Sequence, residues 1–365
     1  MKNSRELYET SIVIDTHADT FARVLDEGED FFSPTSKLAV NYPDMVKGGL
    51  DVQVFALYIA PGLPPGKTIK RAMSMAGTFF QALEASNGKF VMARTVRDVR
   101  TAVASGRKCG LLAVEGGHII EGDLNILRSL RNMGVVTMTL THANTNEWAD
   151  SSQDERRWGG LNDLGREVIR EMNRLRMLID VSHTSDETVE AVLELSETPV
   201  IASHSCCRAI CDHPRNLTDD LIKKIASKGG LIDMAYYPPF VDDAASTAFQ
   251  ERWDQLRGAN SPKVTPEEDP NYMMNLYARC MEGVPAVSID KLCDHIDHAV
   301  SLVGAEHVGL GSDWDGATVV VKGLETCANL PLLNEALIKR GYKSKDLDLI
   351  MGENFLRVLE RAVGE

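Results

Sequence analysis

Short apolar runs recur along this chain, and most of them are followed by a stretch whose apolar residues have helical spacing. The eight runs lie at residues 11–15, 52–59, 110–114, 135–140, 177–181, 200–202, 231–234 and 308–311. Several are apolar at nearly every position, which is typical of parallel strands that are covered on one face and packed inside on the other. Strands that alternate with helices over most of a chain predict an α/β fold with a parallel sheet.

The helical stretches between these runs support the same architecture. The clearest one spans residues 164–176, where Val168, Ile169, Met172 and Leu175 fall at helical spacing. Further helices are expected at residues 69–84, 96–105, 186–195, 218–227, 289–303 and 345–363.

The length of 365 residues fits one large barrel with additions. Eight βα units take roughly 250 residues, so we expect a (β/α)8 TIM barrel that forms one domain over residues 1–365. The residues beyond those of the eight βα units are expected to lie in two loop insertions. One is the polar stretch 26–43 after the first strand; the other is 238–285 after the seventh strand, which begins with Pro-Pro and should hold one or two helices.

Charge and composition exclude several kinds of protein. Lysine and arginine number 39 and aspartate and glutamate number 53, which gives a net charge of −14. Such a chain repels nucleic acid and anionic membranes, so neither is expected as a partner. No stretch approaches the ~18 consecutive apolar residues of a membrane span, and a secretory signal is not expected from the N-terminal residues. Seven scattered cysteines without a CxxC favour a reduced, cytoplasmic protein.

Histidines and carboxylates follow six of the predicted strands at their carboxyl ends. They are His17 with Asp19, Glu115, His142, His183, His204 and Asp313. The carboxyl ends of all strands of a βα barrel meet at one face, where the active sites of such barrels lie. The sequence therefore predicts one convergent cluster.

The spacing of these residues suggests two metal ions. His17 and Asp19 are two residues apart at a strand end, so their side chains point to the same side and could hold one ion. His183 and His204 end adjacent strands and could hold a second, with Glu115 as a bridge. Imidazole and carboxylate ligands suit zinc or another first-row divalent metal. Two such ions would hold a bridging hydroxide and polarise a carbonyl, as in metal-assisted hydrolysis.

The other histidines and two buried aspartates are expected to have different roles. No convergent partner is evident for His118, His213, His295, His298 or His307. Asp15 shares the strand face of His17 but lies deeper in the barrel, and Asp180 should point to the face opposite His183. Structural hydrogen bonds are the expectation for both aspartates.

Six motifs together resemble a known family. They are DTHADT, AVEGG, LTHANTNEWADSS, LIDVSHTSD, ASHS with the arginine of a PRN eleven residues after its histidine, and GLGSDWDG. In order and spacing they resemble the membrane (renal-type) dipeptidases, peptidase family M19, within the amidohydrolase-like metal-dependent hydrolases. The resemblance runs from about residue 12 to the C-terminal helix. It implies a (β/α)8 barrel with two zinc ions, held by the ligands assigned above.

The resemblance also implies roles for three further residues. His142 would steady the carbonyl oxygen as it becomes an oxyanion. Arg215 would pair with the C-terminal carboxylate of the substrate, and Asp313 would act as the acid/base that delivers a proton to the leaving amine. The residues alone leave other readings open: a rim hydrogen bond for His142, a solvated arginine for Arg215 and direct metal ligation for Asp313.

The sequence thus predicts a zinc-dependent dipeptidase whose substrates include dipeptides with a D-residue at the C-terminus. One departure from the family is the run His17-Ala18-Asp19-Thr20-Phe21, where many members have Asn between the ligands and Leu-Pro after them. Alternatives are another hydrolase on the same site, acting on acylamino acids, lactones or β-lactams, and an inactive metal-binding protein. The relatives suggest a homodimer.

Overall fold

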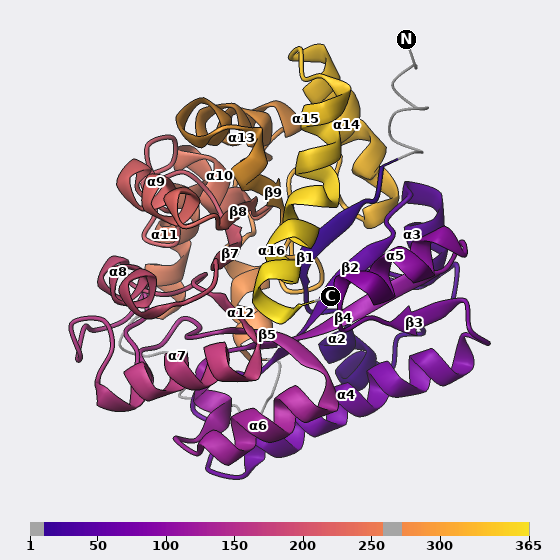
Figure 1. Cartoon of the computed structure of the whole chain (residues 1–365). Helices are drawn as coiled ribbons and strands as arrows, with labels where there is room; N and C mark the ends of the chain where they lie inside the picture. Colours follow the sequence, from indigo (N-terminus) through magenta and orange to yellow (C-terminus); the bar gives the residue numbers. More distant parts are fainter. Residues whose placement is uncertain (1–10, 258–271, 365) are drawn as a thin grey trace.

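A barrel of parallel strands forms the centre of the computed structural model, which describes residues 11–257 and 272–364 (Figure 1). The barrel strands, in spatial order, are β1 (Ile14–Ala18), β2 (Val52–Tyr58), β4 (Lys108–Glu115), β5 (Val135–Thr139), β6 (Leu178–Asp180), β7 (Ile201–Ser205), β8 (Leu231–Met234) and β9 (Val308–Leu310). Backbone contacts just beyond β9 nearly close the barrel: the amide of Asp19 donates to the carbonyl of Trp314 (2.9 Å). The predicted (β/α)8 barrel is confirmed.

The barrel strands are buried along nearly their whole length, as their apolar runs predict. All seven residues of β2 are buried, and this strand pairs with β1 from Ile14 opposite Val52. The register places Tyr58, the last residue of β2, opposite Glu115, the last residue of β4. The carboxyl ends of these strands are therefore level, and their terminal side chains reach the same rim.

Helices follow the strands and cover the outside of the barrel. Those close to prediction are α4 (Lys67–Ala85), α5 (Val96–Ala104), α7 (Asp163–Leu175), α8 (Asp186–Leu195), α9 (Asp219–Ser227) and α13 (Ile289–Val303). Their starts follow from local chemistry: the side chain of Asn162, for example, caps α7 by accepting from the amide of Gly165. No helix in the described ranges is long and apolar enough to cross a bilayer.

Several short elements are not indicated by the sequence patterns. They are helices α2 (Thr20–Glu27), α3 (Tyr42–Gly48), α6 (Leu124–Met133) and α14 (Leu330–Lys339) and strand β3 (Phe90–Met92). Strand β3 has three residues, too few to show a period, and pairs with β4 outside the barrel path.

The C-terminal helix differs from its prediction, because residues 345–363 do not form one continuous helix. Instead α15 (Ser344–Asp348) leads into a π-helical turn (Leu349–Glu353) and then α16 (Asn354–Val363). At the break, Gly352 packs against the start of β1, where any Cβ would overlap the carbonyl oxygen of Ile12. The bend turns α16 across the amino ends of the barrel strands, where its apolar face packs with residues such as Ile14 and Val52 (Figure 1).

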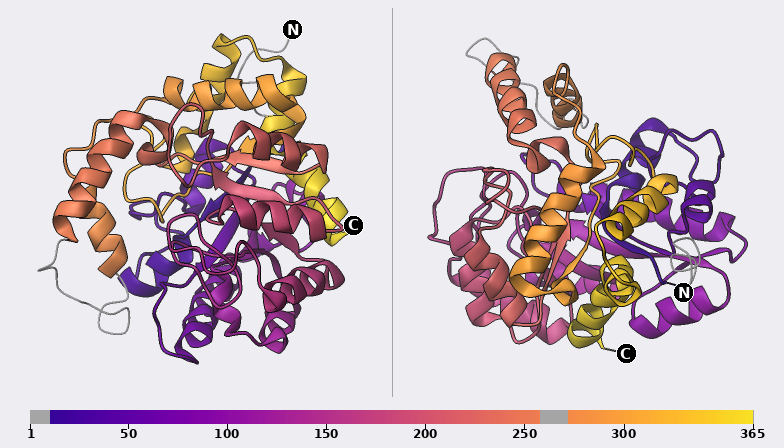
Figure 2. Two further views of the ribbon diagram at one scale, coloured as in Figure 1. Left: turned by 90° about the vertical axis from the view of Figure 1, so that its left-hand side faces the viewer. Right: turned by 90° about the horizontal axis from the view of Figure 1, so that it is seen from above.

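The predicted insertion after the seventh barrel strand, which is β8, is present. In the described part of the chain it forms three helices: α10 (Pro238–Val241), α11 (Asp243–Leu256) and α12 (Tyr272–Cys280). One or two had been expected. The additional one, α10, is a single turn that Pro238 and Pro239 can begin without losing a hydrogen bond. Helices α11 and α12 stand together beside the barrel (Figure 2); residues 258–271 lie outside the described ranges.

Candidate active site

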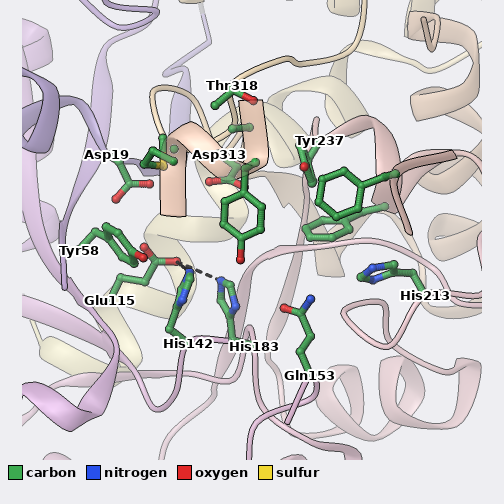
Figure 3. A pocket seen from close by; sticks show the side chains of 16 residues that line it. Asp19, Tyr58, Glu115, His142, Gln153, His183, His213, Tyr237, Asp313 and Thr318 are labelled. Atoms are coloured by element: carbon green, nitrogen blue, oxygen red, sulfur yellow. Dashed lines mark ion pairs between the residues drawn. The ribbon is translucent and has the colours of Figure 1, made fainter. Parts of the chain in front are cut away.

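Four histidines converge on one carboxylate oxygen at the carboxyl end of the barrel. The distances from Oε1 of Glu115 to the histidine Nε2 atoms are 3.0 Å for His183, 3.5 Å for His17, 3.5 Å for His204 and 3.8 Å for His142. Figure 3 shows Glu115 with His142 and His183 on the same side of the pocket. The strand-end histidines predicted to cluster are therefore brought together.

Two aspartates complete the cluster, one directly after β1 and one in the segment after β9. An oxygen of Asp19 lies 3.6 Å from Nε2 of His17, and an oxygen of Asp313 lies 4.0 Å from the same atom. The amide of Asp313 donates to the carbonyl of His17, which ties these two segments together. His17 lies inside β1 and His204 inside β7, whereas the sequence analysis had placed both after their strands.

The electrostatics of the cluster suit a bound cation. Burial raises the pKa of Asp19 to about 7 and that of Asp313 to about 8, because an unpaired carboxylate is poorly solvated there. Burial also holds the pKa values of His183 and His204 well below the usual range, which leaves neutral imidazoles with free lone pairs. Nε2 of His17 and Oδ1 of Asp19 are buried without a hydrogen-bond partner. These donors fit divalent metal ions.

Three overlapping groups of side chains could each hold an ion within the described part of the chain. They are His17, Glu115 and His204; Glu115, His142 and His183; and His17, Asp19 and Asp313. Glu115 belongs to two of them, as a bridging ligand would. The Nε2 atoms of His183 and His204 are 2.8 Å apart, close enough to face one ion. The geometry also allows His142 and Asp313 to be ligands. For Asp313, direct metal ligation was one of the alternatives that the sequence left open.

A chain of hydrogen bonds orients His204. Its Nδ1 lies 2.8 Å from Oγ of Ser203, and that hydroxyl donates to a carboxylate oxygen of Asp180 (2.5 Å). Asp180 also accepts from the hydroxyl of Thr139 (2.7 Å). A proton fixed on Nδ1 leaves Nε2 free to bind a metal, which is the usual function of such outer partners. The structural hydrogen bonds expected for Asp180 are present.

Ser151 holds two other histidines in place. Its hydroxyl lies 2.6 Å from the carbonyl of His142 and 3.2 Å from that of His183. His183 has a φ of 69°, which is uncommon for a residue with a side chain, so its loop needs such support. Ser151 lies within the motif LTHANTNEWADSS, but the sequence does not show that its hydroxyl contacts two histidine carbonyls.

Two further aspartates hold together the segments at the carboxyl end of the barrel by hydrogen bonds. Asp15 accepts from the amide of Ser312 and from the side-chain amide of Gln53, both at 2.8 Å, as the structural role predicted for it requires. Asp315, which the sequence analysis did not single out, is buried and accepts from the hydroxyl of Thr20 (2.7 Å) and the amide of Ala39 (2.8 Å). Asp315 thereby ties the segment after β9 to the loop after β1.

Arg215 is buried beside the cluster. Its Nη2 donates to the carbonyl of His204 (3.0 Å), and its Cζ lies 5.1 Å from the centre of the Phe240 ring. Burial lowers the pKa of Arg215 to about 10, so the group still carries its charge at neutral pH. Nε of Arg215 is buried without a partner. The solvated arginine that its local sequence allowed is therefore excluded, although Arg215 is not among the described residues that line the pocket.

Three of the five histidines set aside in the sequence form hydrogen bonds away from the cluster, and a fourth, His118, lies beside the residue that follows Glu115. His295 accepts from the amide of Cys207, His298 pairs with Asp219, and Nδ1 of His307 lies 2.8 Å from the carbonyl of Gly230. The ring of His118 fills the space beside Gly116. The fifth, His213, differs because it lines the pocket, opposite Asp19 and Glu115 (Figure 3). His213 lies two residues from Arg215 in the chain, and its sequence context gives no sign that it lines a pocket.

A pocket opens beside the cluster and has two unlike sides. One side consists of Asp19, Tyr58, Glu115, His142, His183 and Asp313. The other is an aromatic wall of Tyr237, Phe240, Phe249 and Tyr277, contributed by the segment after β8. Both predicted insertions were expected to shape the pocket. Among the described residues that line it, none comes from 26–43, because that loop packs against Asp315 instead.

Comparisons with known proteins agree with this arrangement. The membrane dipeptidase (peptidase family M19) profile matches residues 1–364. Dipeptidase verJ of Clonostachys rogersoniana is 32% identical over 295 residues, which are 80% of this chain and 66% of that protein, so the chain spans about two thirds of that relative. The probable dipeptidase PvdM of Pseudomonas aeruginosa, 23% identical, has the same fold (TM-score 0.87, covering 98% of this chain and 97% of that one).

A solved metallopeptidase is also similar over nearly its whole length. This enzyme, from Rhodobacter sphaeroides, is liganded with a phosphinate mimic of the dipeptide L-Ala-D-Ala. It is 25% identical, with a TM-score of 0.79 and coverage of 96% of this chain and 99% of that one. The chain therefore belongs to the membrane dipeptidase family, peptidase family M19, a family of dipeptide-hydrolysing enzymes.

Proposed function

We propose that this chain is a zinc-dependent dipeptidase that cleaves the single peptide bond of dipeptides, including those with a D-residue at the C-terminus. The observation that carries the proposal is the convergence of four histidines on Glu115, with the buried cation of Arg215 close behind. The similarity to a metallopeptidase that binds a mimic of L-Ala-D-Ala supports the D-residue.

Five residues are assigned as ligands of two zinc ions. His17 and Asp19 would hold one, His183 and His204 the other, and Glu115 would contact both. Bound there, two divalent ions would lower the pKa of a water molecule and polarise the scissile carbonyl.

The remaining polar residues are assigned roles toward the substrate. Arg215 would hold the C-terminal carboxylate, which fixes the position of the peptide bond relative to the cluster. His142 would donate to the carbonyl oxygen as negative charge develops on it. Asp313 would accept the proton of the attacking water and pass it to the leaving nitrogen. If Arg215 must bind a free C-terminal carboxylate on the residue next to the scissile bond, only dipeptides fit the site.

The direct test is hydrolysis of a panel of L-Xaa-L-Xaa and L-Xaa-D-Xaa dipeptides by protein loaded with zinc and by the same protein after chelation. Cleavage of dipeptides but not tripeptides is expected, with activity lost on chelation and restored by zinc. Failure of the zinc-loaded protein to cleave any dipeptide would refute the proposal.

Replacing Arg215 by methionine is expected to lower kcat/KM for dipeptides by about 10²-fold, because the substrate carboxylate would lose its charged partner in a buried site. Steady-state kinetics measure the effect, and metal analysis checks that His204, whose carbonyl Arg215 contacts, still supports zinc binding. Arg208→Met is the matched control, since it removes an arginine that pairs with Asp186 away from the pocket. Unchanged turnover in Arg215→Met would mean that the substrate lacks this carboxylate, as a lactone does.

A further inference from the structure

The rings of the aromatic wall contact one another. The ring of Tyr237 packs edge-on against Phe240 (centroids 5.0 Å apart) and Phe249 (5.9 Å). Tyr277 of α12 lies 6.1 Å from Phe249 of α11, so the two insertion helices meet in this wall. Edge-to-face contacts of this kind favour these ring positions. The wall therefore offers a continuous apolar surface beside the cluster.

The wall lies next to the arginine assigned to the substrate carboxylate. Phe240 is both part of the wall and the ring over which Arg215 is placed. A carboxylate held by Arg215 therefore sits beside the wall, and the side chain on the same α-carbon is the group that meets these rings. The residue facing the wall is the C-terminal residue of the dipeptide.

The polar hollow outside the wall adds a charge preference. It shares Phe249, Tyr277 and His213 with the pocket, so it adjoins the same site. Its acidic residues are Asp154, Asp212, Glu251 and Asp254, and among the described residues that line it Arg257 is the one arginine or lysine. Excess negative charge at this point repels an anionic side chain.

We propose that this enzyme selects dipeptides whose C-terminal residue has an aromatic or large aliphatic side chain, which packs on the wall of Tyr237, Phe240, Phe249 and Tyr277, and that it discriminates against acidic C-terminal residues. This inference rests on the proposed dipeptidase function and adds the substrate class. Burial of a large apolar side chain against such a surface is worth roughly tenfold or more in kcat/KM over alanine.

The experiment compares kcat/KM for Ala-Phe, Ala-Leu, Ala-Ala and Ala-Glu, each with an L- and a D-configured second residue, on zinc-loaded full-length protein. Within each series, Phe and Leu are expected to exceed Ala by about tenfold or more, with Glu below Ala. Equal or lower values for Phe and Leu would overturn the selectivity while leaving the dipeptidase function intact. Cleavage of no dipeptide at all would instead overturn the proposed function, and the selectivity with it.

Variants of Phe249 test whether the selectivity for the C-terminal residue depends on the aromatic wall. Phe249→Ala is expected to reduce the Phe-to-Ala ratio by about tenfold while Ala-Ala is still cleaved, and Phe249→Leu, which preserves most of the packing, by less. Phe80→Leu is the control, because Phe80 lies on α4, packs against Phe79 and does not line the pocket. A ratio unchanged in both Phe249 variants would contradict the assignment to this wall, as would an equal loss in Phe80→Leu.

Discussion

Replacing Glu115 by glutamine is expected to lower kcat/KM for dipeptides by about 10³-fold or more and to leave less than one tightly bound zinc per chain. Glu115 is the carboxylate around which the Nε2 atoms of four histidines gather, and it is buried at the end of β4. The neutral amide removes one negative charge and one strong ligand shared by both proposed ions. Loss of several kcal/mol of charge stabilisation at the transition state corresponds to about three powers of ten in rate. Elemental analysis and steady-state kinetics measure the two effects.

The matched control for this variant is Glu187→Gln. Glu187 is a half-exposed glutamate on α8 that pairs with Arg156 at the surface, so its replacement removes the same charge without touching the cluster. Wild-type zinc content and activity are expected for it. Two zinc ions per chain and near wild-type turnover in Glu115→Gln would refute the bridging assignment.

Replacing Asp313 by asparagine is expected to lower kcat by about 10²- to 10⁴-fold with little change in KM or in zinc content. An oxygen of Asp313 lies 4.0 Å from Nε2 of the proposed ligand His17, where it could take a proton from the attacking water and return it to the leaving nitrogen. Asparagine keeps the shape and position of the side chain but cannot transfer the proton. The loss should therefore appear in the chemical step rather than in substrate binding.

Asp19→Asn gives the informative comparison, since Asp19 and Asp313 belong with His17 to the same group of possible ligands. Asp19→Asn is expected to lose zinc, whereas Asp313→Asn keeps it. Loss of one zinc ion from Asp313→Asn would contradict the acid/base role and make Asp313 a ligand.

The barrel and its cluster could be predicted because both depend on local patterns. Apolar runs such as 135–140 identify buried strands, and polar residues at their carboxyl ends must share one rim, so His17, Glu115 and His204 could be grouped without knowing any distance. Strand ends were less certain: β1 continues to Ala18 because Ala18 still pairs with Phe55 of β2, and sequence alone does not show that pairing.

The supporting residues could not be predicted, because their partners are distant in the chain. Asp315 accepts hydrogen bonds from residues more than 270 positions away, and Ser151 contacts His142 and His183 through backbone carbonyls that any residue has. The aromatic wall could not be predicted for the same reason. Phe249 and Tyr277 are far apart in the sequence, and they meet only because α11 and α12 pack together.

Helix α16 has a consequence for how the protein is made. Its 10 residues cover the amino ends of the barrel strands, yet the ribosome adds them after every one of those strands. While the chain is being synthesised, apolar side chains such as Leu178 and Ile201 lack their final cover, so the barrel can finish folding only after residues 354–363 have emerged. Nascent chains that stop short of α16 would expose this apolar end, which would make them targets for chaperones and proteases although every catalytic residue is already present.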